Sequence, residues 1–332
     1  MRWLCAVGAK YFFKSIEVIG KENIPDDSGY ILAVNHQNSF IDAIICAVTN
    51  PPSLHYLTRS DVFVPPWDTI LGALHMMPVY RMRDGIAKLS KNEETFARCY
   101  RLMEDHGGVL IFSEANTIKH HYLRPLSKGT ARLAIQSQQA VSQPMYIVPT
   151  GLNYVHHDES NHKVVVQYGK PIAVNDYMQA YQEEPPQTLN KLKKDLTDAI
   201  KSLMWIPEKD DHYEKKSAIV RHFGDYCSFQ ELTALINDHE RVSLPENRHK
   251  SRILKSLMSL PNWPVFYLTG VILKQMQDPQ FILSIKFLAS IFLLPIYWLL
   301  IYILILPFLG FWITNVVIAL MILSLFLRAQ VK

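Results

Sequence analysis

A long run of uncharged residues near the carboxyl terminus constrains this chain more than any other feature. Residues 287–327 contain no Asp, Glu, Lys or Arg over 41 positions. As one straight helix this run would extend about 60 Å, roughly twice the thickness of a bilayer's hydrocarbon core. Pro307 and Gly310 divide it into two parts, each near the shortest length that spans a membrane. We therefore predict a membrane hairpin within residues 276–332, with helices at about 287–306 and 311–327.

Basic residues around this run predict its orientation. Lys274 and Lys286 precede it, Arg328 and Lys332 follow it, and the central turn contains no basic residue. Because short loops rich in Lys and Arg stay in the cytoplasm, both ends of the hairpin are expected there. The protein would then be an integral membrane protein with its remaining domains on the cytoplasmic face. Two alternatives stay open: a hairpin buried in a soluble core, and a hairpin that enters the bilayer without crossing it.

Composition limits the classes of partner. The 332 residues carry a formal net charge of +4, and no cluster of Lys and Arg interleaved with aromatic residues appears. We therefore expect no nucleic-acid partner, and the small positive excess suits anionic membrane lipids or a phosphate-bearing substrate. The four cysteines are widely separated and form no Cys-x-x-Cys pair, which predicts reduced thiols and no metal site.

The chain before the hairpin alternates short apolar runs with helical patterns, which indicates an α/β fold with a mixed sheet flanked by helices. Residues 1–15 suit a helix at a membrane interface or one in an ordinary core. Residues 205–275 are expected to form a helical subdomain or linker whose role the sequence does not define. Strands are expected near residues 16–19, 30–34, 54–57, 78–83, 109–112, 145–149 and 163–169, and helices from residue 40, over 86–106, opening within 123–134, and over 188–204.

A strand-to-helix turn contains the first candidate for chemistry. His36 follows the apolar run of residues 30–34, and Asp42 lies in the helix expected to begin at Phe40. Open α/β sheets place reactive groups at such turns. A neutral imidazole can take a proton from a hydroxyl near pH 7, and a nearby carboxylate can orient it and stabilise the imidazolium. We expect a ring nitrogen of His36 to lie within hydrogen-bond reach of the Asp42 carboxylate, directly or through one water.

A structural role is the alternative for Asp42. Ser39 and Asp42 have the Ser-x-x-Asp spacing of a capping box, in which both side chains satisfy backbone amides at the start of a helix. A carboxylate at the third helical position can also accept backbone amides and still present an oxygen to His36.

Other polar residues also appear where predicted strands end. Arg81 and Arg83 close one strand, and both are candidate anion ligands because guanidinium groups bind phosphate in a bidentate manner. As isolated residues, such arginines are more often simple surface charges. Glu114 and Asn116 follow another predicted strand, and Lys128 precedes a helix whose amino end is suited to an anion.

Four segments together resemble the glycerol-phosphate acyltransferase family of the PlsC type. Their order and spacing over residues 16–174 match the four sequence blocks of that family. The first block is the most specific, and the fourth is weak. The segments are Asn35-His36-Gln37-Asn38-Ser39-Phe40-Ile41-Asp42, the stretch from Gly72 to Arg81 that ends in Pro-Val-Tyr-Arg, Phe112-Ser113-Glu114-Ala115-Asn116, and Ile147-Val148-Pro149-Thr150.

The resemblance implies an α/β acyltransferase fold that moves a fatty acyl group from a thioester to a glycerolipid hydroxyl. His36 would take the hydroxyl proton, and Asp42 would hold the imidazole. Arg81 would bind the phosphate of the acceptor, Glu114 would support the acceptor or the site, and Pro149 would shape the acyl pocket. Acyl-CoA or acyl-carrier protein would be the donor, and no metal or organic cofactor is implied.

Two departures from the family pattern concern the site. The family has four residues between the histidine and the aspartate, whereas this chain has five. The extra residue is expected in the turn between His36 and Ser39, and the longer spacing resembles the branch that includes fungal glycerol-3-phosphate and dihydroxyacetone-phosphate acyltransferases. The third block of the family usually reads Phe-Pro-Glu-Gly-Thr-Arg, and the arginine is absent here. Lys119, Arg124 or Lys128 would have to supply that positive charge.

The leading expectation is an O-acyltransferase domain over residues 16–204 that acylates 1-acylglycerol 3-phosphate or glycerol 3-phosphate in phospholipid biosynthesis. The altered third block leaves open a lysophospholipid or an acylated amino acid lipid as the acceptor. A catalytically silent membrane scaffold with the same fold is the alternative from another class. A histidine and arginines at strand ends argue against it, since a scaffold needs neither.

Overall fold

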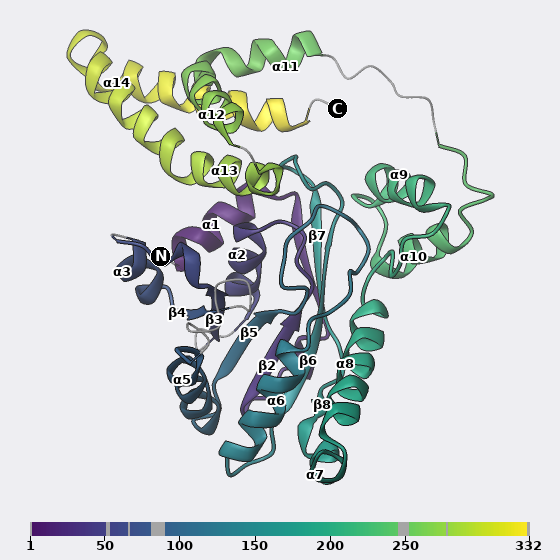
Figure 1. The fold of residues 1–332 in the computed structure, drawn as a ribbon. Coiled ribbons are helices and arrows are strands. Elements are labelled where there is room, and N and C mark those ends of the chain that lie inside the picture. Colours follow the sequence, from purple (N-terminus) through teal and green to yellow (C-terminus); the bar gives the residue numbers. More distant parts are fainter. Residues whose placement is uncertain are drawn as a thin grey trace.

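A mixed sheet forms the centre of the molecule. The fold comes from a computed structural model that describes residues 2–50, 54–65, 67–80, 90–244, 252–276 and 278–330. Within this part of the chain the sheet has eight strands in the order β1-β7-β6-β2-β5-β3-β4, with β8 paired to β6 beside this path (Figure 1). The β6–β7 and β6–β8 pairs are antiparallel and the other pairs are parallel, so the sheet is mixed as predicted. The strands are β1 (Ser15–Ile19), β2 (Tyr30–Val34), β3 (Leu54–Arg59), β4 (Met76–Val79), β5 (Gly108–Phe112), β6 (Tyr146–Tyr154), β7 (Lys163–Tyr168) and β8 (Ile172–Ala173).

Strand β2 lies in the middle of the sheet, and all five of its residues are buried. Tyr30, Leu32 and Val34 belong to the core on one face, while Ile31 and Ala33 belong to the core on the other. A strand covered on both faces must be apolar at every position, which is why it appears in the sequence as an unbroken run. Its observed limits are those that the run predicted.

Two sets of helices cover the two faces of the sheet. One core cluster includes residues of α1 (Arg2–Phe12), α2 (Phe40–Thr49) and α13 (Ile282–Leu288). The other includes residues of α5 (Asn92–Glu104), α6 (Gly129–Ala140) and α8 (Pro185–Lys201). Two further helices of this unit are α3 (Trp67–Ala73) and α7 (Met178–Glu183). Helix α1 has one face in the core and leaves Trp3 and Tyr11 exposed.

Several boundaries differ from the sequence-based predictions. The helix predicted over 86–106 is α5, which begins at Asn92, and residues 86–89 lie outside the described part of the chain. The strand predicted over 78–83 is β4, which starts and ends earlier. The helix predicted to open within 123–134 begins only at Gly129, because the connection before it has no helical turn and places Leu123 and Leu126 in the core.

Two helices after α8 form a small unit against the sheet. These helices, α9 (Tyr213–Phe223) and α10 (Phe229–Asn237), share a third core cluster with Val155 and Val165 from the β6–β7 region. Helix α10 starts with a capping box formed by Ser228 and Glu231. Residues 205–244 therefore pack on the antiparallel side of the sheet.

An apolar hairpin ends the described chain. Helix α13 continues through a π-helical turn (Ala289–Leu293) into α14 (Leu294–Gln330), which is broken at Gly310, where φ is 69° and ψ is 170°. The break lies in the predicted turn, and Figure 1 shows the two arms of α14 meeting at that tip. The segment Pro279–Ala329 contains an 18-residue stretch with a mean hydropathy of 2.5, and the segment is long and apolar enough to cross a membrane by length and composition.

Helices α11 (Arg252–Ser259) and α12 (Trp263–Gln275) pack against this hairpin. The buried Asn262 between them joins both arms: its Oδ1 accepts from Trp298 Nε1 at 2.8 Å, and its Nδ2 donates to the Met321 carbonyl at 2.9 Å. The Arg328 Nε donates to the Ser259 hydroxyl at 2.8 Å. The second part of the region 205–275 is therefore associated with the hairpin.

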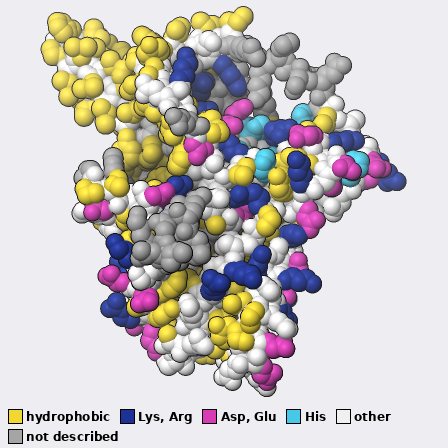
Figure 2. All heavy atoms as spheres, in the orientation of Figure 1, with side chains coloured by type: hydrophobic (Ala, Val, Ile, Leu, Met, Phe, Trp, Pro, Cys, Tyr) yellow, Lys and Arg dark blue, Asp and Glu magenta, His cyan; other side chains and the backbone are white. Residues whose placement is uncertain are grey.

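The hairpin exposes large hydrophobic side chains. Figure 2 shows them gathered over the lobe that contains α14, whereas charged side chains are interspersed over the rest of this face. Phe308 and Trp312, on either side of the break, are 83% and 81% exposed. A continuous apolar surface of this kind is costly in water and is typical of a segment that contacts lipid.

Candidate active site

The turn between β2 and α2 is anchored to the neighbouring strand. Asn35 is fully buried, and its Nδ2 donates to the Leu152 carbonyl at 3.0 Å while its Oδ1 accepts from the Leu152 N–H at 2.7 Å. These bonds extend the parallel pairing of β2 with β6, in which Val34 lies opposite Thr150. They fix the position of His36, the next residue, at the carboxyl end of β2.

Asp42 organises this turn. Its Oδ2 accepts hydrogen bonds from the backbone N–H groups of Gln37 and Asn38, each at 2.8 Å, and lies 2.8 Å from Nδ1 of His36. The Asp42 side chain is completely buried, whereas that of His36 is 16% exposed. The contact expected between His36 and Asp42 is therefore present, and it is direct.

Tyr154 provides a fourth donor to the same carboxylate. Its hydroxyl donates to Asp42 Oδ1 at 2.6 Å. Burial and the nearby Asp42 charge hold the pKa of Tyr154 well above its usual range, so the hydroxyl keeps its proton. Because a carboxylate surrounded by donors only accepts, His36 carries its proton on Nδ1 and has Nε2 as the acceptor nitrogen of the neutral imidazole.

The capping-box interpretation of Ser39 is wrong. Ser39 occupies the N-cap position of α2, but its side chain makes no capping hydrogen bond and its φ is 48°. The Asp42 carboxylate is taken by His36, Gln37, Asn38 and Tyr154 instead. Asp42 nevertheless lies in the first turn of α2, as expected. The turn before the helix folds back so that two backbone amides point at the carboxylate.

Phe112 and Glu114, at and just after the end of β5, also hold His36 in place. The Phe112 ring stacks on the imidazole, with centroids 3.9 Å apart and planes 13° from parallel. The backbone N–H of His36 donates to Glu114 Oε1 at 2.8 Å. Stacking and this hydrogen bond restrict both the ring and the main chain, so the imidazole is held before any substrate arrives.

Arg124 is the cation that pairs with Glu114. Its Nε donates to Glu114 Oε2 at 2.8 Å, and its Nη2 donates to the Asn116 carbonyl. Burial raises the pKa of Glu114, while the His36 N–H and Arg124 oppose that rise. Of the three residues proposed to replace the absent family arginine, Arg124 therefore contacts the third block, whereas Lys119 pairs with Asp158.

The other predicted site residues are Arg81, Arg83, Asn116, Lys128 and Pro149. Arg81 and Arg83 lie outside the described residues. The Asn116 side chain is exposed, and the residue meets the cluster through its carbonyl. Lys128 is exposed at the N-cap of α6. Pro149 is buried within β6 opposite Ala33 of β2. The roles assigned to these residues remain predictions.

Replacing Arg124 by glutamine is expected to destabilise the fold by about 3 kcal/mol near pH 8, because it leaves the buried Glu114 carboxylate without its cation. The Glu114 pKa, already raised by burial, would rise further. When a carboxyl has a raised pKa in the folded state, the free energy of unfolding of the protein falls as the pH rises through that pKa. The difference in unfolding free energy between Arg124→Gln and the wild type should therefore shrink as the pH falls through the Glu114 pKa. Urea unfolding at several pH values measures this difference.

The matched control is Lys119→Gln, since the side chain of its partner Asp158 is 51% exposed. We expect this variant to lose little stability at any pH. An Arg124→Gln deficit that stayed constant across the carboxyl titration would contradict the role given to Glu114.

Sequence reasoning did not identify Tyr154 or Ser284 as part of the site. Ser284 of α13 accepts from the Ile41 N–H at 3.1 Å and donates to the Asn38 carbonyl at 3.3 Å through its hydroxyl. Both are remote in the chain from the turn that carries His36, and neither belongs to a local pattern that would have marked it. The start of the hairpin therefore contacts the turn that carries His36.

A cavity of about 260 Å³ is lined mainly by residues 155–159, which follow β6. His157, one of its lining residues, has Nε2 3.0 Å from the side-chain oxygen of Gln37. Burial and the neighbouring His121 hold the pKa of His157 well below its usual range. Burial also lowers the pKa of His121, a second lining residue, to about 3. Both imidazoles are therefore neutral near pH 7.

Sequence comparisons match parts of this chain to acyltransferases. Residues 15–153 match the family model described as Acyltransferase. The chain is 32% identical over 114 residues to glycerol-3-phosphate O-acyltransferase 2 of Saccharomyces cerevisiae, a match that covers 34% of this chain and 15% of the yeast protein. It is 33% identical over 72 residues to the 1-acyl-sn-glycerol-3-phosphate acyltransferase of Bacillus subtilis, covering 21% of this chain and 36% of that protein.

A solved structure of the 1-acyl-sn-glycerophosphate acyltransferase PlsC from Thermotoga maritima aligns with a TM-score of 0.43 and 14% identity, over 59% of this chain and 77% of that one. In the two curated relatives, the segments that match this chain make up only 15% and 36% of the protein's length.

Proposed function

We propose that the protein transfers a fatty acyl group from an acyl thioester to the free hydroxyl of 1-acylglycerol 3-phosphate or glycerol 3-phosphate, starting from the match of residues 15–153 to the family model described as Acyltransferase. The observation that carries the proposal is the direct contact of His36 with a buried carboxylate inside the matched segment. That contact gives the imidazole the tautomer that a general base needs.

The proposed reaction begins when Nε2 of His36 takes the proton of the acceptor hydroxyl. The oxygen attacks the thioester carbonyl carbon, a C–O bond forms, and the carbonyl electrons move to its oxygen. When the tetrahedral intermediate collapses, the C–S bond breaks and the leaving sulfur takes the proton back from His36. Asp42 stabilises the imidazolium through Nδ1–H throughout this cycle. The products are an ester and a free thiol, and the exchange needs no metal or organic cofactor.

Acyl-CoA and acyl-carrier protein are the proposed donors. The two curated relatives are named for glycerol 3-phosphate and 1-acyl-sn-glycerol 3-phosphate, which supports these acceptors here. Both acceptors carry a phosphate that needs a cationic partner, and Arg81, Arg83 and Lys128 are proposed for that role. Arg124 is committed to Glu114. Pro149 is proposed to shape the acyl pocket, and Asn116 to border the acceptor site.

A lipid acceptor also suits the position of the site. Ser284 joins the first turn of α13 to the catalytic turn, so His36 lies at the base of the apolar hairpin. A lysophospholipid that stays in a bilayer could present its headgroup there without leaving the membrane. This arrangement is the reason to favour an acylated acceptor over free glycerol 3-phosphate.

A panel of acceptors tests the proposal. Purified full-length protein in lipid vesicles would receive labelled palmitoyl-CoA or palmitoyl-acyl-carrier protein together with one acceptor: glycerol 3-phosphate, 1-acylglycerol 3-phosphate, lysophosphatidylcholine or an N-acyl amino acid. We expect labelled product with the phosphate monoesters and the fastest turnover with 1-acylglycerol 3-phosphate. Transfer only to lysophosphatidylcholine or to the amino acid lipid would contradict the proposed acceptor. No transfer to any acceptor would favour the scaffold alternative.

We further propose that the hairpin spans the membrane with the acyltransferase domain on the cytoplasmic face. The first arm leaves the protein core near Leu294, and residues 292–309 extend about 27 Å at 1.5 Å per residue. The second arm, residues 311–330, extends about 30 Å. Both lengths are close to the hydrocarbon thickness of a bilayer.

Cysteine labelling tests this topology in a background without the four native cysteines. A Leu309→Cys variant should react with a membrane-impermeant maleimide added to intact cells. A cysteine on the exposed surface of α8, as in Lys194→Cys, should react only after the membrane is opened. Labelling of both positions only from the cytoplasmic side would contradict the spanning topology.

A further inference from the structure

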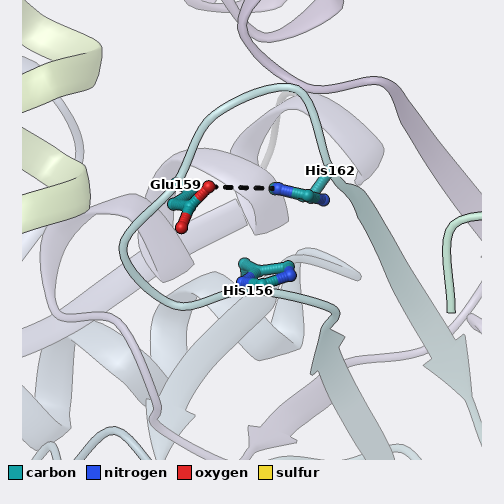
Figure 3. Close-up of side chains that lie close together, drawn as sticks. All are labelled: His156, Glu159 and His162. Atoms are coloured by element: carbon teal, nitrogen blue, oxygen red, sulfur yellow. Dashed lines mark ion pairs between the residues drawn. The ribbon is translucent and has the colours of Figure 1, made fainter. Parts of the chain in front are cut away.

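The loop between β6 and β7 gathers two imidazoles and a carboxylate outside the catalytic turn. His156, Glu159 and His162 each offer one ligand atom, and these atoms lie within 4.8 Å of one another. Figure 3 shows Glu159 and His162 directed at each other with the His156 ring beside them. His162 Nε2 lies 3.6 Å from Glu159 Oε2. Nothing in the proposed acyl transfer uses these three residues.

His162 is oriented by a second carboxylate. Its Nδ1 lies 2.7 Å from Asp225 Oδ2, and the other oxygen of Asp225 accepts from the Lys163 N–H at 2.8 Å. Asp225 therefore receives the hydrogen of Nδ1, which leaves Nε2 as the nitrogen that faces Glu159. Histidines that bind metals in proteins almost always donate their other N–H to a carboxylate or carbonyl in this manner, which fixes the ring and increases its basicity.

His156 has the matching arrangement with a carbonyl. Its Nε2 lies 3.3 Å from the main-chain oxygen of Arg221 in α9. A carbonyl oxygen accepts only, so this contact favours the tautomer in which the other ring nitrogen is a neutral donor to a metal. The His156 and His162 rings lie 3.9 Å apart between centroids. Both rings are thus positioned by groups outside the cluster.

We propose that His156, Glu159 and His162 bind a divalent transition-metal ion of the zinc type. Two imidazoles and one carboxylate are a donor set that suits Zn²⁺ and its neighbours Co²⁺ and Ni²⁺, with a water as fourth ligand. Bonds of about 2.0–2.2 Å in tetrahedral geometry require ligand atoms roughly 3.4 Å apart. The ligand atoms must therefore approach one another while the His156 and His162 rings, whose planes are now 32° from parallel, turn so that both nitrogen lone pairs point at one ion. The half-exposed Glu159 side chain on this loop can move to complete the set.

The ion would have a structural role. His162 begins the approach to β7, Arg221 belongs to α9, and Asp225 follows α9, so the ion would join the β6–β7 loop to the α9–α10 unit. The neighbouring His157 contacts Gln37 of the catalytic turn. Binding would therefore stiffen a loop that borders the turn while taking no part in acyl transfer. This departs from the sequence-based expectation of no metal site, which considered only cysteine spacing.

A second cluster serves as the matched comparison. His212, His239 and Glu240 also bring their ligand atoms within 4.8 Å of one another. In that cluster, Nδ1 of His239 lies 3.1 Å from the main-chain carbonyl oxygen of Ile236. A carboxylate behind an imidazole raises its basicity more than a carbonyl does, which favours the cluster backed by Asp225.

Zinc titration of the full-length, tag-free protein in detergent tests the proposal. After treatment with a chelator and desalting, isothermal titration calorimetry with Zn²⁺ should show about one strong site per chain. The thermal unfolding midpoint should rise with Zn²⁺ and return with EDTA, because a ligand that binds the folded state stabilises it. Co²⁺ should give the visible absorption of a tetrahedral site.

Variants assign the binding to this loop. The double variant His156→Gln/His162→Gln should lose the strong site, whereas His212→Gln/His239→Gln should keep it. Asp225→Asn, which retains an acceptor for His162, should weaken binding by about 10- to 100-fold. Should the first double variant fail to fold by circular dichroism, Glu159→Gln replaces it and is expected to weaken binding.

Three results would overturn the proposal. These are no strong zinc site in the wild type, unchanged affinity in Glu159→Gln, and loss of the site only in the His212→Gln/His239→Gln variant.

Discussion

The His36→Ala substitution is expected to reduce kcat for acyl transfer by about 10²- to 10⁴-fold, the range that a positioned general base contributes. The imidazole has Nδ1 committed to Asp42, which leaves Nε2 to take the proton of the acceptor hydroxyl. No described neighbour can replace it: Asp42 is completely buried, and Glu114 is paired with Arg124. KM should change little, because the deleted ring acts on the reacting hydroxyl rather than on the rest of the acceptor.

The stability of the His36→Ala variant should remain near that of the wild type. The ring is partly exposed, and the backbone bonds of Gln37 and Asn38 to Asp42 do not depend on it. Single-turnover measurements with palmitoyl-CoA and 1-acylglycerol 3-phosphate would give the rate of the chemical step. His222→Ala, a change at an exposed histidine of α9, is the matched control and should keep full activity. Equal rates in His36→Ala and wild type would exclude the proposed base.

The Asp42→Asn substitution is the second change with a large expected effect. The introduced amide side chain can place its oxygen where Oδ2 now accepts three hydrogen bonds and its nitrogen where Oδ1 faces the Tyr154 hydroxyl, which can rotate to accept. The geometry can therefore survive while the negative charge is lost. Without that charge the imidazolium is not stabilised, and we expect kcat to fall by about 10²- to 10⁴-fold.

The Asp42→Asn variant should also lose about 2 kcal/mol of unfolding free energy, because hydrogen bonds to a charged acceptor become bonds to a neutral one. Tyr154→Phe is the informative comparison, since it removes one donor and keeps the charge. It should lower stability by about 1–3 kcal/mol and kcat by less than Asp42→Asn does. A larger kcat loss in Tyr154→Phe than in Asp42→Asn would show that the tyrosine, and not the charge, supports His36.

The base of the hairpin lies against the turn that carries His36. Ser284 and the start of α2 share hydrogen bonds, and Phe287 and Ile291 belong to the same core cluster as Ile41 and Ile45. The hairpin is therefore part of the packed core and not a tether attached by a linker. A lipid acceptor would meet the active site at a position set by this packing.

Much of the fold could be predicted from local sequence patterns. The buried run of β2 has the predicted limits, because a strand covered on both faces must be apolar at every position. The break at Gly310 lies in the predicted turn, because a charge-free run twice the length of a bilayer span has to reverse. His36 and Asp42 are six positions apart on one turn, so their contact depends mainly on local geometry.

The remaining site depends on contacts between distant residues. Tyr154 lies 112 positions beyond Asp42, and Ser284 lies 243 positions beyond Ile41. Sequence reasoning left three cations as partners for the third block, and only the path of the connection before α6 brings Arg124 to Glu114. The capping box considered at Ser39 failed for a reason that is partly local, since the backbone amides of Gln37 and Asn38 take one Asp42 oxygen and only Tyr154, which takes the other, is distant in the chain.

By itself the sequence determined most of the strands, the apolar hairpin and the pairing of His36 with Asp42. These follow from periodicity, from the absence of charge and from short-range spacing, which act within one element or one turn. The tertiary structure alone decided that Tyr154 and Arg124 complete the cluster, that the hairpin base meets the catalytic turn, and that three residues of the β6–β7 loop converge. Those contacts depend on which strands and helices pack side by side, and the periodicity within one element does not specify its neighbours.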